Sequence, residues 1–530
     1  MEKQKNFLFK KISGIIPCIF FGALCGAVSG ALIFLFKLLY SYLADLSVIL
    51  YSEAKSSLIY IVILFSALVV LAAFMIFIHI ALPEVKGGGI PRSEGILRGT
   101  LSFRPLKTLI GAFAGSMISF FGGLPLGSEG PAVLIGTSVG NLCMGSSGKK
   151  NAWSRYVMTG GASAGFAVAT GAPLSGLLFS LEEIHKRFTP ILVLTVSVSV
   201  ISATFVNEIL SDMFGISTYL FHIDALPNIE LSHIGYLLLL GISVSVGVAI
   251  FDASISIFHK FMSTPKKSVR PWMEIVLVFI FSGIIGLTLT DGVFSGHDTV
   301  HTAIDITVPI LYLLIIFIIR LLMMLLVTDS GVTGGIFIPT LAIGAVFSAM
   351  ISKLLLLIGL PTEYYTAFVL LGMCAFIGGT LRAPITATIF FVELTGQFTG
   401  IFFVALVVFT VNIITEVIGQ KPFYDRVLEE ISNEQNKGKT VEIGCFEMKV
   451  SAGSFVIGKA VRDIMWPPSA VVVSITRADD TKKDMDNDGE KKLYAHDTVI
   501  IRTKFYDEKE LVDSLYALVG TEFEIKKMDL

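Results

Sequence analysis

Long apolar runs, each near the length needed to cross a lipid bilayer, are the feature that most limits what this chain can fold into. They lie at residues 12–40, 58–82, 191–205, 234–258, 273–289, 308–327 and 402–418. A helix needs roughly 20 consecutive apolar residues to span the hydrocarbon core. Charged residues make up only 15% of the chain, against about 25% in an average soluble domain. The sequence therefore predicts an all-α polytopic membrane protein.

The charges at the start of the chain predict its orientation. Lys3, Lys5, Lys10 and Lys11 precede the first apolar run, which is too long for the apolar core of a signal peptide. Positive residues concentrate on the cytoplasmic side of membranes. We expect a multi-pass protein of the inner (cell) membrane with a cytoplasmic N-terminus. The net charge of −2 gives no indication of a nucleic-acid partner, and the five cysteines form no CxxC pair that would suggest a metal site.

The composition changes once along the chain and divides it into two bodies. Residues 1–430 carry the apolar runs and form the predicted membrane domain, and the polar residues 431–440 form the predicted linker. Residues 441–530 contain three strand-like segments, "FEMKV", "AVVVSITR" and "DTVIIRT", followed by the helix-like "DEKELVDSLYALVG". We predict a small C-terminal α+β domain on the cytoplasmic side.

Two motifs recur within the membrane domain in one order and at nearly one offset. Pro131 corresponds to Pro339 (339 − 131 = 208), and Pro173 corresponds to Pro384 (384 − 173 = 211). Duplicated halves that glycine and proline interrupt at matching positions are typical of transporters with an inverted-topology repeat and discontinuous helices. The alternative is the ordinary glycine and proline content of membrane helices. The shared spacing favours duplication.

Three glycine-rich motifs predict helices that begin inside the membrane: "KGGGIPRSEG" (86–95), "GSEGPAVLIG" (127–136) and "GGIFIPTLAIG" (334–344). Proline suits the first turn of a helix, and glycine lets the preceding backbone turn. A helix start exposes unpaired N–H groups and about half a positive charge, and an anion satisfies both. Three such starts at one point would form an anion site without any lysine or arginine.

A single carboxylate, Glu129, stands in the second motif, and no other charged side chain occurs between Lys107 and Lys149. A carboxylate at the bilayer centre costs at least about 2.5 kcal/mol. Beside helix N-termini it can itself occupy the anion site, and once protonated it gives way to a mobile anion. We therefore predict that Glu129 links proton occupancy to anion occupancy. The alternative is a helix cap without a role in transport.

In this order the motifs resemble those of the CLC family of chloride channels and chloride/proton exchangers. The family's GSGIP, GxEGP and GxFxP motifs are matched by residues 87–91, 127–131 and 335–339, and its late tyrosine by Tyr424. The resemblance covers roughly residues 10–430. It implies a homodimer in membrane lipid, with one pore in each subunit, that moves chloride and protons. It implies neither an enzyme nor a cofactor.

The resemblance also implies roles for single residues. Glu129 matches the external gating glutamate, and Glu183 matches the internal proton-transfer glutamate of family exchangers. The two together favour an exchanger over a passive channel, which is the alternative. Glu182 and its repeat partner Glu393 are expected to be structural. The residues expected to bind the anion are Gly88, Gly89, Ile90, Gly130, Ile336, Phe337 and Tyr424.

One residue departs from the family pattern. Gly88 stands where the family usually has a serine whose hydroxyl contacts the central anion. Family members with other residues at this position can prefer nitrate or fluoride. Chloride is the expected substrate, with these two ions as alternatives.

The C-terminal domain resembles the C-terminal half of bacterial RCK (TrkA-C-type) regulatory domains. The matching segments are "KVSAGSFVIGKAVRDIMWPPSAVVVSITR" and "LYAHDTVIIRT". In some bacterial transporters such domains dimerise and bind cyclic di-AMP. Two interpretations remain open: a sensor of a cyclic dinucleotide, and a dimerising module without a ligand.

Two short motifs resemble metal sites but are interpreted as loops. "DMDNDG" (484–489) begins like a calcium loop, yet Ala495 stands where the bidentate glutamate is needed. "HDTVH" (297–301) approaches the zinc-protease motif, but its surroundings indicate a loop between membrane helices. An intramembrane metalloenzyme that uses His297 and His301 is the alternative from another class of function, and zinc content would identify it.

Overall fold

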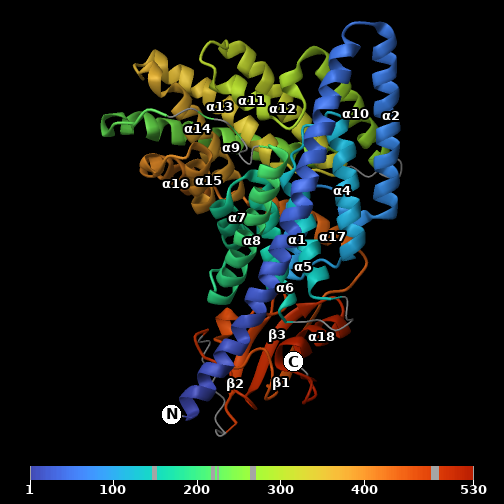
Figure 1. Ribbon diagram of the computed structural model, residues 1–530, viewed down its shortest axis with the longest axis vertical. Coiled ribbons are helices and arrows are strands. Elements are labelled where there is room, and N and C mark those ends of the chain that lie inside the picture. Colours follow the sequence, from blue (N-terminus) through green and yellow to red (C-terminus); the bar gives the residue numbers. More distant parts are fainter. Residues whose placement is uncertain are drawn as a thin grey trace.

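The protein consists of a helical body with a small sheet domain at one end (Figure 1). The computed structural model describes residues 2–145, 152–216, 221, 223, 226–262, 270–478 and 489–528. Within these ranges, eight helices are long and apolar enough to cross a membrane. The predicted fold class is therefore confirmed. We call the end of the helical body next to the sheet domain the domain side, and the opposite end the far side.

The helices of the body fall into two halves that follow each other in the chain. The first half contains α1 (Glu2–Ala54), α2 (Leu58–Ala81), α3 (Gly89–Arg98), α4 (Pro105–Phe121), α5 (Glu129–Cys143), α6 (Ser154–Thr170), α7 (Pro173–Phe179), the π turn η2 (Ser180–Ile184) and α8 (Pro190–Phe214). The second half contains α9 (Ile234–Met262), α10 (Arg270–Thr288), α11 (His297–Ile304), α12 (Ile310–Ser330), α13 (Phe337–Leu357), α14 (Tyr365–Leu381), α15 (Pro384–Thr395), α16 (Ile401–Ile418) and α17 (Phe423–Gln435).

Two of the spanning helices, α13 and α14, fall outside the apolar runs that the sequence singles out. The span that includes α14 has a mean hydropathy of 1.6 and is 94% buried, whereas α2 has 3.2 and is 22% buried. A helix surrounded by other helices does not need large apolar side chains facing lipid. Small residues let it pack closely instead, which lowers its hydropathy.

Helices α7 and α15 cap each other through corresponding glutamates. Glu393, near the end of α15, accepts hydrogen bonds from the backbone N–H groups of Leu174 and Ser175 at 2.7 and 2.8 Å. Glu182, just after α7, accepts from the N–H groups of Ile385 and Thr386 at 2.9 and 2.7 Å. Each carboxylate satisfies donors at a helix start, where the helix dipole favours negative charge. The start of each helix thus lies beside the end of the other, and the exchange links the two halves of the body.

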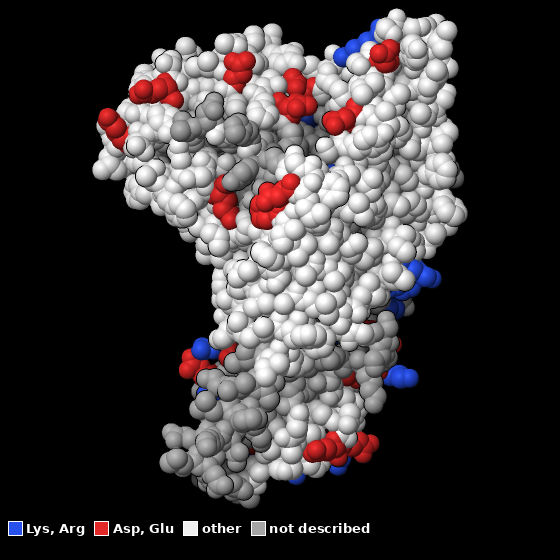
Figure 2. All heavy atoms as spheres, in the orientation of Figure 1, with Lys and Arg blue, Asp and Glu red and all other residues white. Residues whose placement is uncertain are grey.

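The face of the helical body shown in Figure 2 carries no charged side chain across its middle. In Figure 2, a belt without lysine, arginine, aspartate or glutamate separates acidic groups toward the far side from basic groups at its domain-side edge. Such a belt matches the hydrocarbon region of a bilayer, where an ionised side chain is costly.

The C-terminal domain is a four-stranded antiparallel sheet with one helix. Its strands are β1 (Glu442–Lys449), β2 (Val471–Thr476), β3 (Thr498–Phe505) and β4 (Lys526–Met528), in the order β2-β3-β1-β4. The helix α18 (Glu508–Val519) ends at Gly520. The three strands and the helix predicted from the sequence are present, and β4 is additional. Helix α17 continues to Gln435, so the first part of the expected linker 431–440 is helical.

The prediction of a loop at residues 297–301 is wrong, because these residues begin helix α11 (His297–Ile304). Gly296 precedes it with a φ of 109°, a conformation that suits glycine. The imidazole Nδ1 of His297 lies 2.7 Å from the hydroxyl of Ser295, and its ring lies 5.2 Å from that of Phe221. No group of three metal-binding side chains occurs among the described residues. The "DMDNDG" motif lies outside them, except for Gly489.

Removing the acceptor at Glu182 tests the exchange between α7 and α15. We expect Glu182→Ala to destabilise the protein by about 1–3 kcal/mol, because it leaves two N–H groups at the start of α15 without an acceptor. Thermal unfolding in detergent measures the loss. Glu53→Ala, at an exposed position near the end of α1, is the control. Equal unfolding temperatures for the two variants would contradict the proposed role.

Candidate functional site

Three helices of the body begin at one place. Gly127, just before α5, and Gly335, just before α13, exchange backbone hydrogen bonds of 2.7 and 2.8 Å. The start of α3 joins them, because the N–H of Gly87 donates to the carbonyl oxygen of Gly331 at 2.7 Å. The three glycine-rich motifs therefore start helices, as predicted, and these helix starts meet. We call this place the junction of α3, α5 and α13.

Glycine is required at the junction because backbone touches backbone there. A β-carbon on Gly89 would lie 2.0 Å from the carbonyl oxygen of Gly130. A β-carbon on Gly130 would lie 2.8 Å from the Cα of Gly335. Real β-carbons do not approach other atoms so closely, so any side chain would separate the helix starts. The N-terminal ends of the three helices, with their partial positive charges, are thus held together.

Glu129 is the first residue of α5 and is completely buried at the junction. Its Oε1 accepts a hydrogen bond from the Ser128 hydroxyl at 3.1 Å. Its Oε2 has no hydrogen-bond partner among the described residues, and it lies 2.3 Å from where a β-carbon on Gly127 would stand. The carboxylate therefore folds back over the junction and does not point into lipid.

Gly88 borders the junction but has more room than Gly89. A β-carbon on Gly88 would lie 3.7 Å from the nearest atom of Pro91, 3.8 Å from the carbonyl oxygen of Gly334 and 3.9 Å from the side chain of Ile336, all ordinary contacts. Its φ of −70° is open to any residue. Glycine at this position is therefore not imposed by packing, and the backbone would accept the serine that the family usually has.

The remaining residues expected to bind an anion are also buried. Ile90, Ile336 and Phe337 are 1%, 6% and 3% exposed. Tyr424, in the first turn of α17, is fully buried, and its hydroxyl has no hydrogen-bond partner among the described residues. Helix α17 packs against α3, where Leu428 closes over Gly95. A buried hydroxyl without a protein partner costs free energy unless a ligand or water pairs with it.

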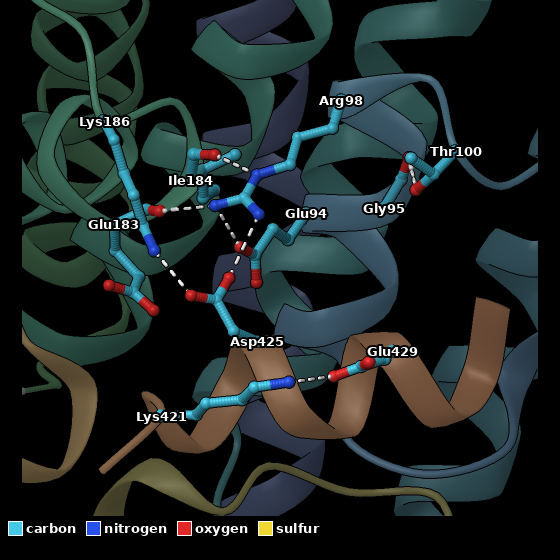
Figure 3. A network of polar contacts seen from close by, with 10 residues as sticks. All are labelled: Glu94, Gly95, Arg98, Thr100, Glu183, Ile184, Lys186, Lys421, Asp425 and Glu429. Carbon is cyan, nitrogen blue, oxygen red and sulfur yellow. Dashed lines mark hydrogen bonds and ion pairs between the residues drawn. The ribbon is translucent and has the colours of Figure 1, made fainter. Parts of the chain in front are cut away.

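Glu183 lies in η2, on the domain side of the body, and is also completely buried. Neither of its carboxylate oxygens has a hydrogen-bond partner among the described residues. Figure 3 shows the backbone carbonyl of Glu183 facing Arg98, within a cluster of charged groups formed by Glu94, Arg98, Lys186 and Asp425, while no dashed line reaches its carboxylate. A buried carboxylate without a hydrogen-bond donor is easily protonated, so the position suits a group that takes up and releases protons.

The charged cluster ties three elements together around Glu183. Arg98, at the end of α3, pairs with Glu94 at 2.5 Å and with Asp425 of α17 at 3.0 Å. Its guanidinium also donates to the carbonyl oxygens of Ile184 at 2.8 Å and Glu183 at 3.3 Å. Lys186 pairs with Asp425 at 2.6 Å.

The sequence interpretation missed this cluster. Glu94 and Arg98 stand four residues apart, a spacing that places them on one helix face. That signal could have indicated the pair, but nothing local to the sequence indicated that Asp425 joins it.

Comparison with known proteins agrees with the fold described above, a polytopic helical body with discontinuous helices. The family model described as "Voltage gated chloride channel" matches residues 68–416. The H(+)/Cl(−) exchange transporter ClcA of Vibrio cholerae serotype O1 is 29% identical over 389 residues, 70% of this chain and 81% of that protein.

Solved structures share the architecture at lower identity. A slow cyanobacterial Cl−/H+ antiporter has a TM-score of 0.73 at 24% identity, over 79% of this chain and 99% of its own. A CLC-type fluoride/proton antiporter has a TM-score of 0.62 at 17% identity, over 76% of this chain and 96% of its own.

Neighbouring glycines at the junction should respond differently to the same substitution. We expect Gly89→Ala to prevent normal assembly, because the new methyl group would overlap the Gly130 carbonyl. Gly88→Ala should fold as the wild type does, since its methyl group makes only ordinary contacts. Size-exclusion profiles and thermal unfolding in detergent would show the difference. Wild-type stability in Gly89→Ala would mean that the helix starts are not in contact.

Proposed function

Because the chain belongs to the voltage-gated chloride channel family, we propose that it is a chloride/proton antiporter. The observation that carries the proposal is the junction of α3, α5 and α13, where three helix N-termini meet around a buried carboxylate with an unpartnered oxygen. Related exchangers of similar fold support the choice of substrates.

The backbone at the junction suits an anion that must both bind and leave. The N–H groups of Ile336 and Phe337 at the start of α13, with the Tyr424 hydroxyl, would donate hydrogen bonds to chloride. Gly88, Gly89, Ile90 and Gly130 line the starts of α3 and α5. Partial charges hold an ion less tightly than a full lysine or arginine charge would, so transport is not blocked by tight binding.

Glu129 would couple the two ions by competition. Ionised, its carboxylate occupies the positive end of the three helices in place of chloride. Protonated, it no longer gains from those helix ends, so it moves away and chloride enters. Binding of a proton to Glu129 and binding of chloride at the junction are thus linked through this one side chain. An exchanger needs such a link and an open channel does not.

Glu183 would serve as the proton acceptor on the domain side. It is buried and without a hydrogen-bond donor, whereas the nearby Asp425 is held ionised by Arg98 and Lys186. The neighbouring positive charges can stabilise Glu183 briefly when it loses its proton. Protons would reach Glu129 from here by a path separate from that of the anion.

The domain side is proposed to face the cytoplasm of an inner (cell) membrane. On the face shown in Figure 2, the far side of the body carries several acidic groups, and lysines or arginines lie at the domain-side edge of the uncharged belt, which agrees with the positive-inside rule. The chain begins on the same side as the C-terminal domain (Figure 1). Both termini would then be cytoplasmic.

We further propose a homodimer whose C-terminal domain is regulatory. The dimer follows the family, and the regulatory role follows the resemblance of residues 441–530 to RCK domains. A cyclic dinucleotide such as cyclic di-AMP is the proposed ligand of that domain. The proposal for the transport site is independent of it.

Neutralising the two glutamates should separate the fluxes. We expect Glu129→Gln to conduct chloride without proton movement, because the side chain can no longer compete as an anion. Glu183→Gln should keep chloride movement and lose coupled proton movement. Both fluxes are recorded in proteoliposomes with chloride and pH electrodes, and Glu53→Gln serves as the control. Retention of wild-type coupling in both variants would contradict the mechanism.

Restoring the missing hydroxyl should change the anion preference. A hydrogen bond to a charged group contributes about 1.5–3 kcal/mol, so Gly88→Ser is expected to raise chloride flux relative to nitrate by about tenfold or more. Flux of chloride, nitrate and fluoride is compared under one fixed pH gradient. Gly88→Ala, which adds volume without a donor, is the matched control. Equal selectivity in the two variants would show that position 88 does not contact the anion.

A further inference from the structure

An arginine joins the C-terminal domain to the end of α3. Arg155, near the start of α6, donates from Nε to the carbonyl oxygen of Leu97 at 2.7 Å. Its Nη1 donates to the carbonyl oxygens of Met465 and Trp466, in the C-terminal domain, at 3.2 and 3.0 Å. Leu97 lies in the last turn of α3, where helix carbonyls have no partner within the helix. One guanidinium thus satisfies acceptors of both bodies.

The residue after Leu97 continues the connection to the proton site. Arg98 holds the carbonyl oxygens of Glu183 and Ile184, as described above. A contiguous path therefore runs from Met465 through Arg155, the end of α3 and Arg98 to η2. The element η2 is a π turn, a form that is rare in helices and frequent at functional sites.

The contact around Arg155 is an extended interface. The Tyr156 hydroxyl donates to the carbonyl oxygen of Asp463 at 3.0 Å and accepts from the N–H of Met465 at 3.2 Å. The ring of Trp153 meets that of Phe455 edge-on, with centroids 4.7 Å apart. The C-terminal domain is therefore fixed against the start of α6 on both sides of Arg155. Because Arg155 also bonds to Leu97, the position of the domain affects the end of α3.

We infer that Arg155 is a positioning residue through which the C-terminal domain sets the geometry of Glu183. The inference rests on the proton role proposed for Glu183 above. Arg155 is not among the residues of the junction, and its guanidinium is linked to η2 through the end of α3, where Leu97 is followed by Arg98. A shift of the domain moves the end of α3, which changes how Arg98 holds the turn that carries Glu183. The domain then controls coupling of the two fluxes rather than access of chloride to the junction.

Substitution of Arg155 in the full-length protein tests this. In proteoliposomes, Arg155→Ala is expected to lower the ratio of proton flux to chloride flux by about threefold or more, within the range that contiguous networks transmit. Arg155→Lys should recover part of the ratio, because an ammonium group can still reach one of the carbonyls. Tyr156→Phe should shift the ratio in the same direction but less, since it loosens the domain and leaves the bond to Leu97.

The matched control is Arg462→Ala. Arg462 belongs to the C-terminal domain, its side chain is 64% exposed, and it pairs with Glu490 at 2.7 Å on the surface. Its replacement should leave the flux ratio unchanged. In a Glu183→Gln background, Arg155→Ala should have no further effect on chloride flux, because the group that it positions no longer carries protons.

The outcomes separate this inference from the function on which it rests. If Glu183→Gln keeps its proton flux, the proton role proposed for Glu183 is wrong, and the inference about Arg155 falls with it. If Glu183→Gln loses proton flux while Arg155→Ala keeps the wild-type ratio, only the role of Arg155 is overturned. An equal fall of both fluxes in Arg155→Ala would make the residue merely structural and overturn it as well. Should that variant not fold, unchanged ratios in Arg155→Lys and Tyr156→Phe decide against the inference.

Discussion

Contact between glycine backbones at the start of α3, α5 and α13 is the constraint on which the rest of the structure depends. Inside a membrane, a helix start needs an acceptor for its N–H groups, because no water can supply one. Gly89, Gly130 and Gly335 bring three such starts within backbone contact. These helix ends lower the cost of burying the carboxylate of Glu129. The polytopic body is the scaffold that keeps the three ends from separating.

The two buried glutamates differ in how the protein surrounds them. Glu129 lies against helix N-termini and one hydroxyl, with no charged side chain among its hydrogen-bond partners. Glu183 lies beside a cluster in which Arg98 and Lys186 are already engaged with Asp425 and Glu94. The first environment fits the proposed replacement of the carboxylate by another anion. The second fits the proposed change in protonation while the side chain stays in place.

Much of this site could be predicted from the sequence because its parts are local. Glycines before a proline mark each helix start, and a lone acid in an apolar stretch marks Glu129. The contacts of Asp425 and Arg155 could not be predicted, because their partners are more than 50 residues away. For Arg155, these partners are also backbone carbonyls, which every residue has. Helix α11 was missed for a different reason, since the glycine before it was interpreted as part of a loop.

The mutual capping of α7 and α15 bears on how such a protein could arise. Glu182 and Glu393 occupy equivalent places in the two halves. Each half therefore supplies a carboxylate to a helix start of the other half and receives one at its own. Two separate copies of an ancestral half-length chain, inserted in opposite directions, could have made the same exchange across a twofold axis. Fusion of the two genes would have preserved these bonds while freeing Glu129 and Glu183 to diverge.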